Sequence, residues 1–285
     1  MRRLWIALGI VAVAVGSVVA GSLQASPRVE TALAAGDIAT CGGNGDARTA
    51  DVVAGQSGTV LTLGNNAYPA GSTADFAHCF GPTWGRFKSR IRPAAGARDY
   101  RSPGAAAYRR YFGLSRTYYA FDLGAWRLYA LDSERISRAQ LAWLRRDLAE
   151  HPRRCVLAYW SRPLFNSGVG GDQPSVRPFW SLLYRAGAEI VLSGQAPDYE
   201  RLTRVDPRGD VDYLHGLREF VVGTGGARRS SKSQVVTDSR TRAVEWWEPG
   251  VLRLQLGPSG YSWRFLATGT PVPDFGGESC HGKPS

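Results

Sequence analysis

The sequence predicts an α/β fold whose core is built on two β-sheets. In the first half of the 285-residue chain, short apolar runs alternate with helical segments, as in βαβ units. In the last third, apolar runs follow one another closely, which is typical of antiparallel strands. Hydrophobic residues make up 44% and charged residues 21% of the chain, as expected for a globular domain and not for a disordered one.

The N-terminal segment is predicted to direct export and not to join the fold. Residues 1–3 include two arginines, residues 4–20 are apolar or small, and residues 18–20 suit a signal-peptidase cleavage site. Residues 1–25 are therefore a signal peptide. The alternative is an uncleaved membrane anchor, because the apolar stretch can be extended to Leu23. Either way, we expect the body of the protein to be secreted or extracytoplasmic, or attached to a membrane by its N-terminus.

Three apolar runs in the first half are predicted strands, with predicted helices between and after them. The strands span 29–35, 59–63 and 91–95, and the helices span 47–55, 72–80 and 105–112. Each of these strands is followed by a glycine-containing polar motif. Because ligands of α/β folds bind outside the carboxyl ends of the strands, these motifs are candidate site segments.

The middle and the end of the chain continue the pattern. Apolar runs on either side of Leu123 and Gly124 predict a hairpin over 117–132. Ser137 is a suitable N-cap for a helix whose leucines at 141, 144 and 148 share one face. The remaining predicted elements are a helix at 176–185 and strands at 155–160, 189–193, 218–222, 243–247, 251–256 and 260–267.

The four cysteines favour two disulfides, because their number is even and the chain is predicted to be exported. None of them forms a CxxC pair, which argues against a zinc knuckle. Three pairings are possible. We favour Cys41–Cys79, which flank neighbouring strand-end loops, and Cys155–Cys280, which would tether the C-terminal tail, residues 271–285.

The chain is strongly basic, with a formal net charge of +11. Without Arg2 and Arg3 it keeps 33 basic and 24 acidic side chains, a net charge of about +9. The charge indicates either a solvated, arginine-rich surface or attraction to an anionic ligand or a cell-envelope component. No strip of interleaved basic and aromatic residues indicates nucleic-acid binding.

Polar motifs follow five of the predicted strands. They read GDIA at 36–39, GNNAY at 64–68, GARD at 96–99, WSRP at 160–163 and SGQAPDYE at 193–200. Their order and spacing resemble those of the calcineurin-like metallophosphoesterases, and Tyr68 is placed as in the purple acid phosphatase branch. The resemblance covers roughly residues 31–267. It implies a two-sheet β sandwich flanked by helices (α/β/β/α), in a domain that spans 28–270.

The resemblance also implies a centre of two metal ions about 3.5–4 Å apart that clamp a phosphoryl displacement. In the family, an aspartate bridges the ions, and histidines, an asparagine and a second aspartate complete their ligand shells. A further histidine assists the leaving group or the transition state.

This chain departs from that ligand set at nearly every position. Only Asp37 and Tyr68 are retained as candidate ligands. In the first three motifs, Ala39 offers no donor atom, Asn65 replaces the bridging aspartate, Ala97 replaces the asparagine and Arg98 replaces the catalytic histidine. In the last two motifs, Ser161 replaces the histidine of the fourth motif, and Gln195 and Pro197 replace the two histidines of the fifth. One carboxylate and one phenol do not supply the about four to six donors that each metal needs, so no metal cofactor is expected.

These residues predict an exported pseudoenzyme with no catalytic residue and with a binding or structural role. The alternative is a residual phosphoric ester hydrolase that uses Asp37, Tyr68 and one metal ion. In the vacated pocket, Arg98 either pairs with Asp37 or Asp99, or stays free with Arg162 to bind a phosphate or another anion. The sequence names no more specific partner.

Overall fold

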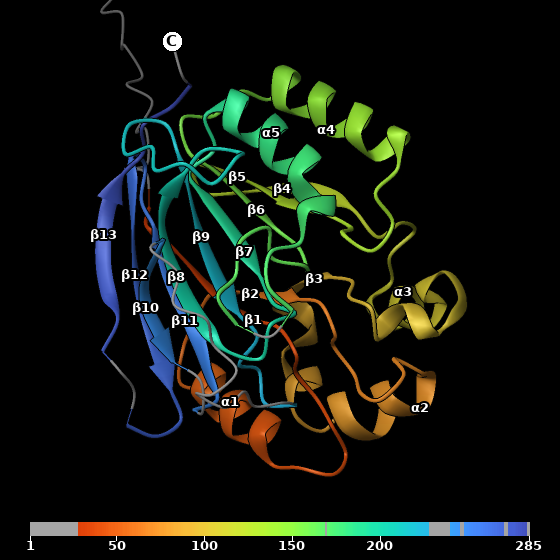
Figure 1. The fold of residues 1–285 in the computed structure, drawn as a ribbon. Helices are drawn as coiled ribbons and strands as arrows, with labels where there is room; N and C mark the ends of the chain where they lie inside the picture. Colours follow the sequence, from red (N-terminus) through yellow and green to blue (C-terminus); the bar gives the residue numbers. More distant parts are fainter. Residues whose placement is uncertain (1–27, 169, 228–239, 246–247, 271–272, 284–285) are drawn as a thin grey trace, which may run out of the picture.

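Two β-sheets pack face to face, with helices outside them, in the computed structural model of the chain (Figure 1). The structure describes residues 28–168, 170–227, 240–245, 248–270 and 273–283. The predicted leader, residues 1–25, and the end of the predicted strand 243–247, at Trp246 and Trp247, lie outside these residues.

The six-stranded sheet has the order β13-β12-β11-β1-β2-β3. Its strands are β1 (Glu30–Ala35), β2 (Thr59–Leu63), β3 (Ile91–Ala94), β11 (Gly250–Leu256), β12 (Gly260–Ala267) and β13 (Phe275–Ser279). Strands β1, β2 and β3 are parallel, so their carboxyl ends share one edge, and β11 runs antiparallel to β1.

The seven-stranded sheet has the order β10-β8-β9-β7-β6-β5-β4. Its strands are β4 (Tyr119–Leu123), β5 (Trp126–Ala130), β6 (Val156–Tyr159), β7 (Ile190–Ser193), β8 (Tyr199–Val205), β9 (Leu217–Val222) and β10 (Thr241–Glu245). Strands β5, β6, β7 and β9 are parallel, whereas β4, β8 and β10 are antiparallel to their neighbours.

In the described part of the chain, the α-helices that accompany the sheets are α1 (Gly45–Ala54), α2 (Thr73–Asp75), α3 (Ala106–Phe112), α4 (Arg138–Glu150) and α5 (Arg177–Ala186). Short helical turns span Phe76–Phe80, Trp84–Arg90, Asp99–Arg101, Pro103–Ala105 and Pro174–Val176. Among the described residues, no helix has the length and apolar character needed to cross a membrane.

Two apolar cores hold the layers together. One fills the space between the sheets and includes Trp126, Leu128 and Leu252. The other lies between the seven-stranded sheet and the α4–α5 layer and includes Leu144 and Phe179. Helices α4 and α5 therefore cover the outer face of the seven-stranded sheet, as Figure 1 shows. The predicted α/β two-sheet sandwich is confirmed.

Local sequence signals explain the best-predicted elements. The hydroxyl of Ser137 accepts a hydrogen bond from the Gln140 N–H at 3.1 Å and caps α4, as predicted. Leu144 and Leu148 are buried and Leu141 packs beside them. Gly187, with φ 72°, ends α5 in the left-handed region that glycine adopts without steric cost.

Two strands were not predicted. Strand β8 begins at Tyr199, inside the last strand-end motif, and its sequence, YERLTRV, mixes charged and apolar side chains without regular alternation. Strand β13 lies in the predicted tail. Its glycines and polar residues give no strand signal in the sequence, and the strand is defined by its pairing with β12.

Both disulfides are present and have the favoured pairing, Cys41–Cys79 and Cys155–Cys280.

Candidate functional site

The five motifs meet at one edge, where the carboxyl ends of strands from both sheets converge. The chain after β1 runs beside the chain after β2, with Ile38 N–H donating to the Asn65 carbonyl at 3.1 Å. Glycines allow these segments to approach one another. Between the sheets, a Cβ on Gly36 would lie 2.7 Å from the Cα of Gly194; within the six-stranded sheet, one on Gly96 would lie 2.3 Å from the Asn65 nitrogen. The sequence spacing thus does bring these segments together.

Asp37, Asn65 and Tyr68 form a buried hydrogen-bonded cluster at this edge, which we call the cup. The Asn65 amide Nδ2 donates to Asp37 Oδ1 at 2.7 Å, and the Tyr68 hydroxyl donates to the same oxygen at 2.9 Å. Asp37 is fully buried and Asn65 is nearly so. Both have φ 52°, in the left-handed region that aspartate and asparagine tolerate better than most residues.

The amide orientation of Asn65 is fixed from both sides. Its Oδ1 accepts the backbone N–H of Arg98 at 2.8 Å, so its Nδ2 must face Asp37. The side chain that stands at the bridging-aspartate position therefore points a hydrogen-bond donor, and not an acceptor, at Asp37.

Arg98 does not fill the cup with an ion pair. Among the described residues, no carboxylate lies within ion-pair distance of Arg98, so the expected pair with Asp37 or Asp99 is wrong in this structure. Its guanidinium carbon lies 5.1 Å from the centroid of the Tyr68 ring, a cation–π contact at the rim of the cup.

Asp99 is satisfied by neutral donors instead. It accepts hydrogen bonds from the backbone N–H of Gly96 at 2.9 Å, from the Asn66 side chain at 3.0 Å and from the Asn66 backbone. Burial nevertheless raises the pKa of Asp99 to about 7, against the opposing effect of these donors. Sequence reasoning named Asp99 but missed Asn66, which is its actual partner.

Arg162 is also not available as expected. It forms a two-pronged ion pair with Glu134, with Nη2 at 2.6 Å and Nε at 3.0 Å from the carboxylate. This partner raises the pKa of Arg162 further. The geometry argues against Arg162 as an anion ligand, because its guanidinium is already neutralised by a planar carboxylate.

The remaining motif residues line the space beside the cup with neutral groups. Ser161 is fully buried, and its carbonyl accepts the Gln195 N–H at 2.8 Å. Gln195 and Pro197, with Pro163 and Gln173, line a cavity of about 180 Å³. Ala97, which follows Gly96, offers no polar atom beyond its backbone.

The donor set does not fit two metal ions. Asp37 Oδ1 already accepts two protein hydrogen bonds, one from the Asn65 amide and one from the Tyr68 hydroxyl. Ala97 and Pro197 have no side-chain donor atom, and Asn65, Ser161 and Gln195 are neutral. In the described part of the chain, no three His, Cys, Asp or Glu side chains are grouped so that they could hold a metal.

Asp198 is a buried acid at this edge that sequence reasoning missed. It is fully buried, and within the described residues neither of its carboxylate oxygens has a hydrogen-bond partner. Burial, and then the nearby charges of Glu200 and Asp37, raise the pKa of Asp198 to about 7. The available signal was its place inside the strand-end motif SGQAPDYE, 193–200, in which only Gln195 and Pro197 were singled out from the sequence.

We expect Asp198→Asn to flatten the pH dependence of stability. The pKa of Asp198 is raised in the folded state from about 3.9 in an unfolded chain, so its contribution is fully present at low pH and is lost as the pH rises toward 7. Between about pH 5.5 and 7.5, this group alone lowers the free energy of unfolding of the parent by about 2 kcal/mol. Urea unfolding of both proteins at these pH values measures the difference.

The matched control for that experiment is Asp210→Asn, at a largely exposed aspartate. It should leave the pH dependence as in the parent. If the free energy of unfolding changed equally with pH in the parent and in Asp198→Asn, this would contradict the conclusion that Asp198 is an ionisable carboxyl group, buried away from water and without a hydrogen-bond partner among the described residues.

Comparison with known proteins agrees with the two-sheet fold described above. No family model matches the chain. Purple acid phosphatase 22 of Arabidopsis thaliana is 30% identical over 136 residues, 41% of this chain, and the match covers 29% of that relative's length. Purple acid phosphatase PPD1 from yellow lupin superposes with a TM-score of 0.66 at 14% identity, covering 89% of this chain and 54% of that one. A dimetal phosphatase from Danio rerio gives 0.60 at 10% identity, covering 86% and 98%. The chain has the metallophosphoesterase fold.

A further solved structure with this fold is GAP50, the anchor in the inner membrane complex of Plasmodium. It superposes with a TM-score of 0.67 at 12% identity, and the match covers 90% of both chains. The metallophosphoesterase fold that the five motifs predicted is thus confirmed. At these identities the likeness concerns the fold alone.

Proposed function

We propose that this protein is an exported pseudophosphatase of the metallophosphoesterase fold, which acts by binding or anchoring and not by metal catalysis. The hydrogen bond from the Asn65 amide to Asp37 carries the proposal. A bridging carboxylate can join two cations, whereas here an N–H group occupies the line between these two side chains. Within the cup, the Asn65 amide and the Tyr68 hydroxyl both donate to Oδ1 of Asp37, in place of a metal ion.

The residual hydrolase is the competing function, and it would use Asp37 and Tyr68 with one metal ion. The two groups are hydrogen-bonded to each other, and Asp198 is a further acid close enough for its charge and that of Asp37 to affect one another. Two carboxylates and one phenol fall short of the about four to six ligands of a catalytic metal. This shortfall supports the non-catalytic proposal.

Two observations support export and an anchoring or binding role. Structural disulfides such as Cys41–Cys79 and Cys155–Cys280 are typical of proteins that fold outside the cytoplasm. GAP50, which shares the fold along 90% of both chains, is an anchor in a membrane complex. Within the cup, Arg98 remains the candidate for binding an anion, because Arg162 is held by Glu134.

Restoring the missing ligands tests the proposal. The variant Asn65→Asp, Ala97→Asn, Arg98→His, Ser161→His, Gln195→His and Pro197→His should bind metal and gain phosphoester hydrolysis, because the scaffold already positions these six residues. The parent should show no turnover of a generic phosphoester with added Mn²⁺, Zn²⁺ or Fe³⁺. Turnover by the parent that is abolished by Asp37→Ala would establish the residual hydrolase instead.

A further inference from the structure

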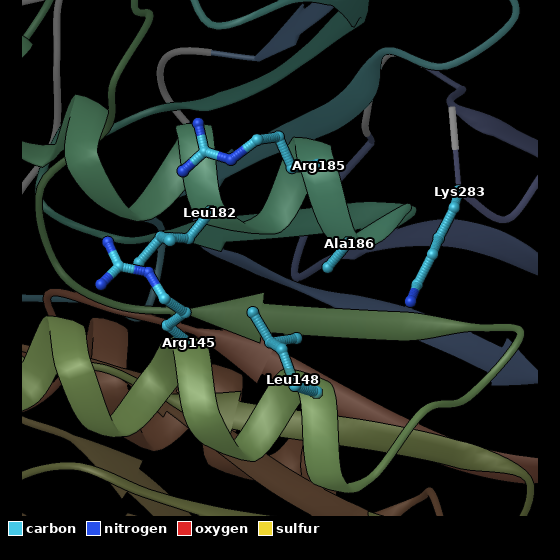
Figure 2. A pocket seen from close by; sticks show the side chains of 7 residues that line it. Arg145, Leu148, Leu182, Arg185, Ala186 and Lys283 are labelled. Atoms are coloured by element: carbon cyan, nitrogen blue, oxygen red, sulfur yellow. The ribbon is translucent and has the colours of Figure 1, made fainter. Parts of the chain in front are cut away.

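A second basic site lies far from the cup in sequence and on a different layer, between α4, α5 and the C-terminal tail. The pocket has a volume of about 220 Å³ and is lined by Arg145 and Leu148 of α4, Leu182 and Arg185 of α5, Ala186, and Lys283 of the tail. Figure 2 shows the guanidinium groups of Arg145 and Arg185 on one side, with the Lys283 side chain reaching toward the pocket from the other.

The three cations of this pocket lack acidic partners. Among the described residues, none of the three lies within ion-pair distance of a carboxylate. The two helices have arginines at 138, 145, 146, 177 and 185 but acids only at 147 and 150. Asp147 is occupied by Arg127 at 2.8 Å, and Glu150 does not line the pocket. Such a concentration of unpaired positive charge favours an anion.

The backbone that leads to Lys283 is held by the fold. Cys280 is bonded to Cys155, and the backbone N–H groups of His281 and Gly282 donate to the buried Glu189 carboxylate at 2.6 and 3.2 Å. A Cβ on Gly187 would lie 2.2 Å from the carbonyl carbon of Gly282, so the tail passes in close contact with the end of α5. The third cation is therefore held at the pocket by a tethered segment.

The floor of the pocket is apolar. Leu148 and Leu182 are largely buried but reach its surface, with Ala186 beside them. The volume is below that of pockets for drug-sized ligands, which are about 300–1,000 Å³. We propose that this pocket binds a phosphate group carried by a short aliphatic body, with the phosphate on the Arg145 and Arg185 side, the aliphatic part on the leucines and Lys283 adding positive charge from the opposite side. The source is either a soluble phosphomonoester or the headgroup region of an anionic phospholipid.

Binding of n-butyl phosphate and of inorganic phosphate to the full chain, followed by calorimetry, tests this site. We expect n-butyl phosphate to bind several-fold more tightly, because only it reaches the apolar floor. The triple variant Arg145→Gln, Arg185→Gln, Lys283→Gln should lose at least about tenfold in affinity for both probes, since charge-assisted hydrogen bonds are lost. The matched control removes three exposed cations elsewhere, Arg101→Gln, Arg110→Gln and Arg264→Gln, and should bind as the parent does.

The outcomes separate the sources. Sedimentation with vesicles of phosphatidylcholine and phosphatidylglycerol in equal parts, but not with pure phosphatidylcholine, supports the lipid source if the pocket variant fails to sediment. Binding of n-butyl phosphate without vesicle binding supports the soluble source. No binding of either phosphate probe by the parent, or equal loss in the control variant, would overturn the proposal. The metal content of the cup does not enter this test, because the pocket shares no residue with it.

Discussion

The double variant Cys155→Ala, Cys280→Ala is expected to lose about 4 kcal/mol of unfolding free energy. This disulfide closes a sequence separation of 125 residues. A disulfide lowers the conformational entropy of the unfolded chain, and the effect grows with the length of the closed loop. The Cys155–Cys280 bond also holds β13, which among the described strands pairs only with β12, and the tail that binds Glu189. For a domain of this size, the melting temperature should fall by about 10 °C.

Calorimetry and amide exchange measure this effect together. Exchange of the β13 amides, Phe275–Ser279, should accelerate more than that of the hairpin β4–β5, which the disulfide does not tether. The comparison is the double variant Cys41→Ala, Cys79→Ala. The disulfide that it removes closes a sequence separation of only 38, so the expected loss of unfolding free energy is smaller. A change in melting temperature of less than about 2 °C would show that the tail is held by its strand pairing alone.

The single variant Asn65→Asp is expected to destabilise the protein by about 3 kcal/mol at pH 8. The Asn65 nitrogen lies 2.7 Å from Asp37 Oδ1, so the change replaces a buried hydrogen bond with two carboxylates in contact. At about pH 5 the loss should shrink, because two adjacent carboxyl groups can share one proton. Chemical denaturation at both pH values, without added metal, measures it.

Asn65→Gly is the matched control, because glycine accepts the positive φ of this position and adds no charge. It should cost about 2 kcal/mol with little pH dependence, the usual contribution of the two hydrogen bonds that the Asn65 side chain makes. An Asn65→Asp protein as stable as the parent at pH 8 would mean that a cation occupies the cup, contrary to the proposed function.

The fold was predictable because its strand ends carry local signals that survive without the metal ligands. Gly36, Gly64 and Gly96 stand where the backbone must turn or approach another chain closely, so they mark strand ends whether or not chemistry remains. Strands β8 and β13 were missed because partner strands, and not their own residues, define them.

The site was predictable in its membership but not in its contacts. Spacing brought Asp37, Asn65 and Tyr68 together, but charge alone suggested that Arg98 would pair with an acid. In the fold, Asn66 reaches Asp99 first and Glu134 takes Arg162, because the backbone places these partners within hydrogen-bond distance. Long-range partners of this kind leave no trace in local sequence.

The metal content of the purified parent, measured beside that of the six-residue restored variant, tests the loss of the metal centre most directly. Both proteins are produced with Mn²⁺, Zn²⁺ and iron in the medium and analysed by elemental mass spectrometry per mole of folded chain. We expect no stoichiometric metal in the parent and bound metal in the restored variant. Stoichiometric metal in the parent, released when Asp37 is replaced by alanine, would contradict the proposal that this fold has lost its metal centre.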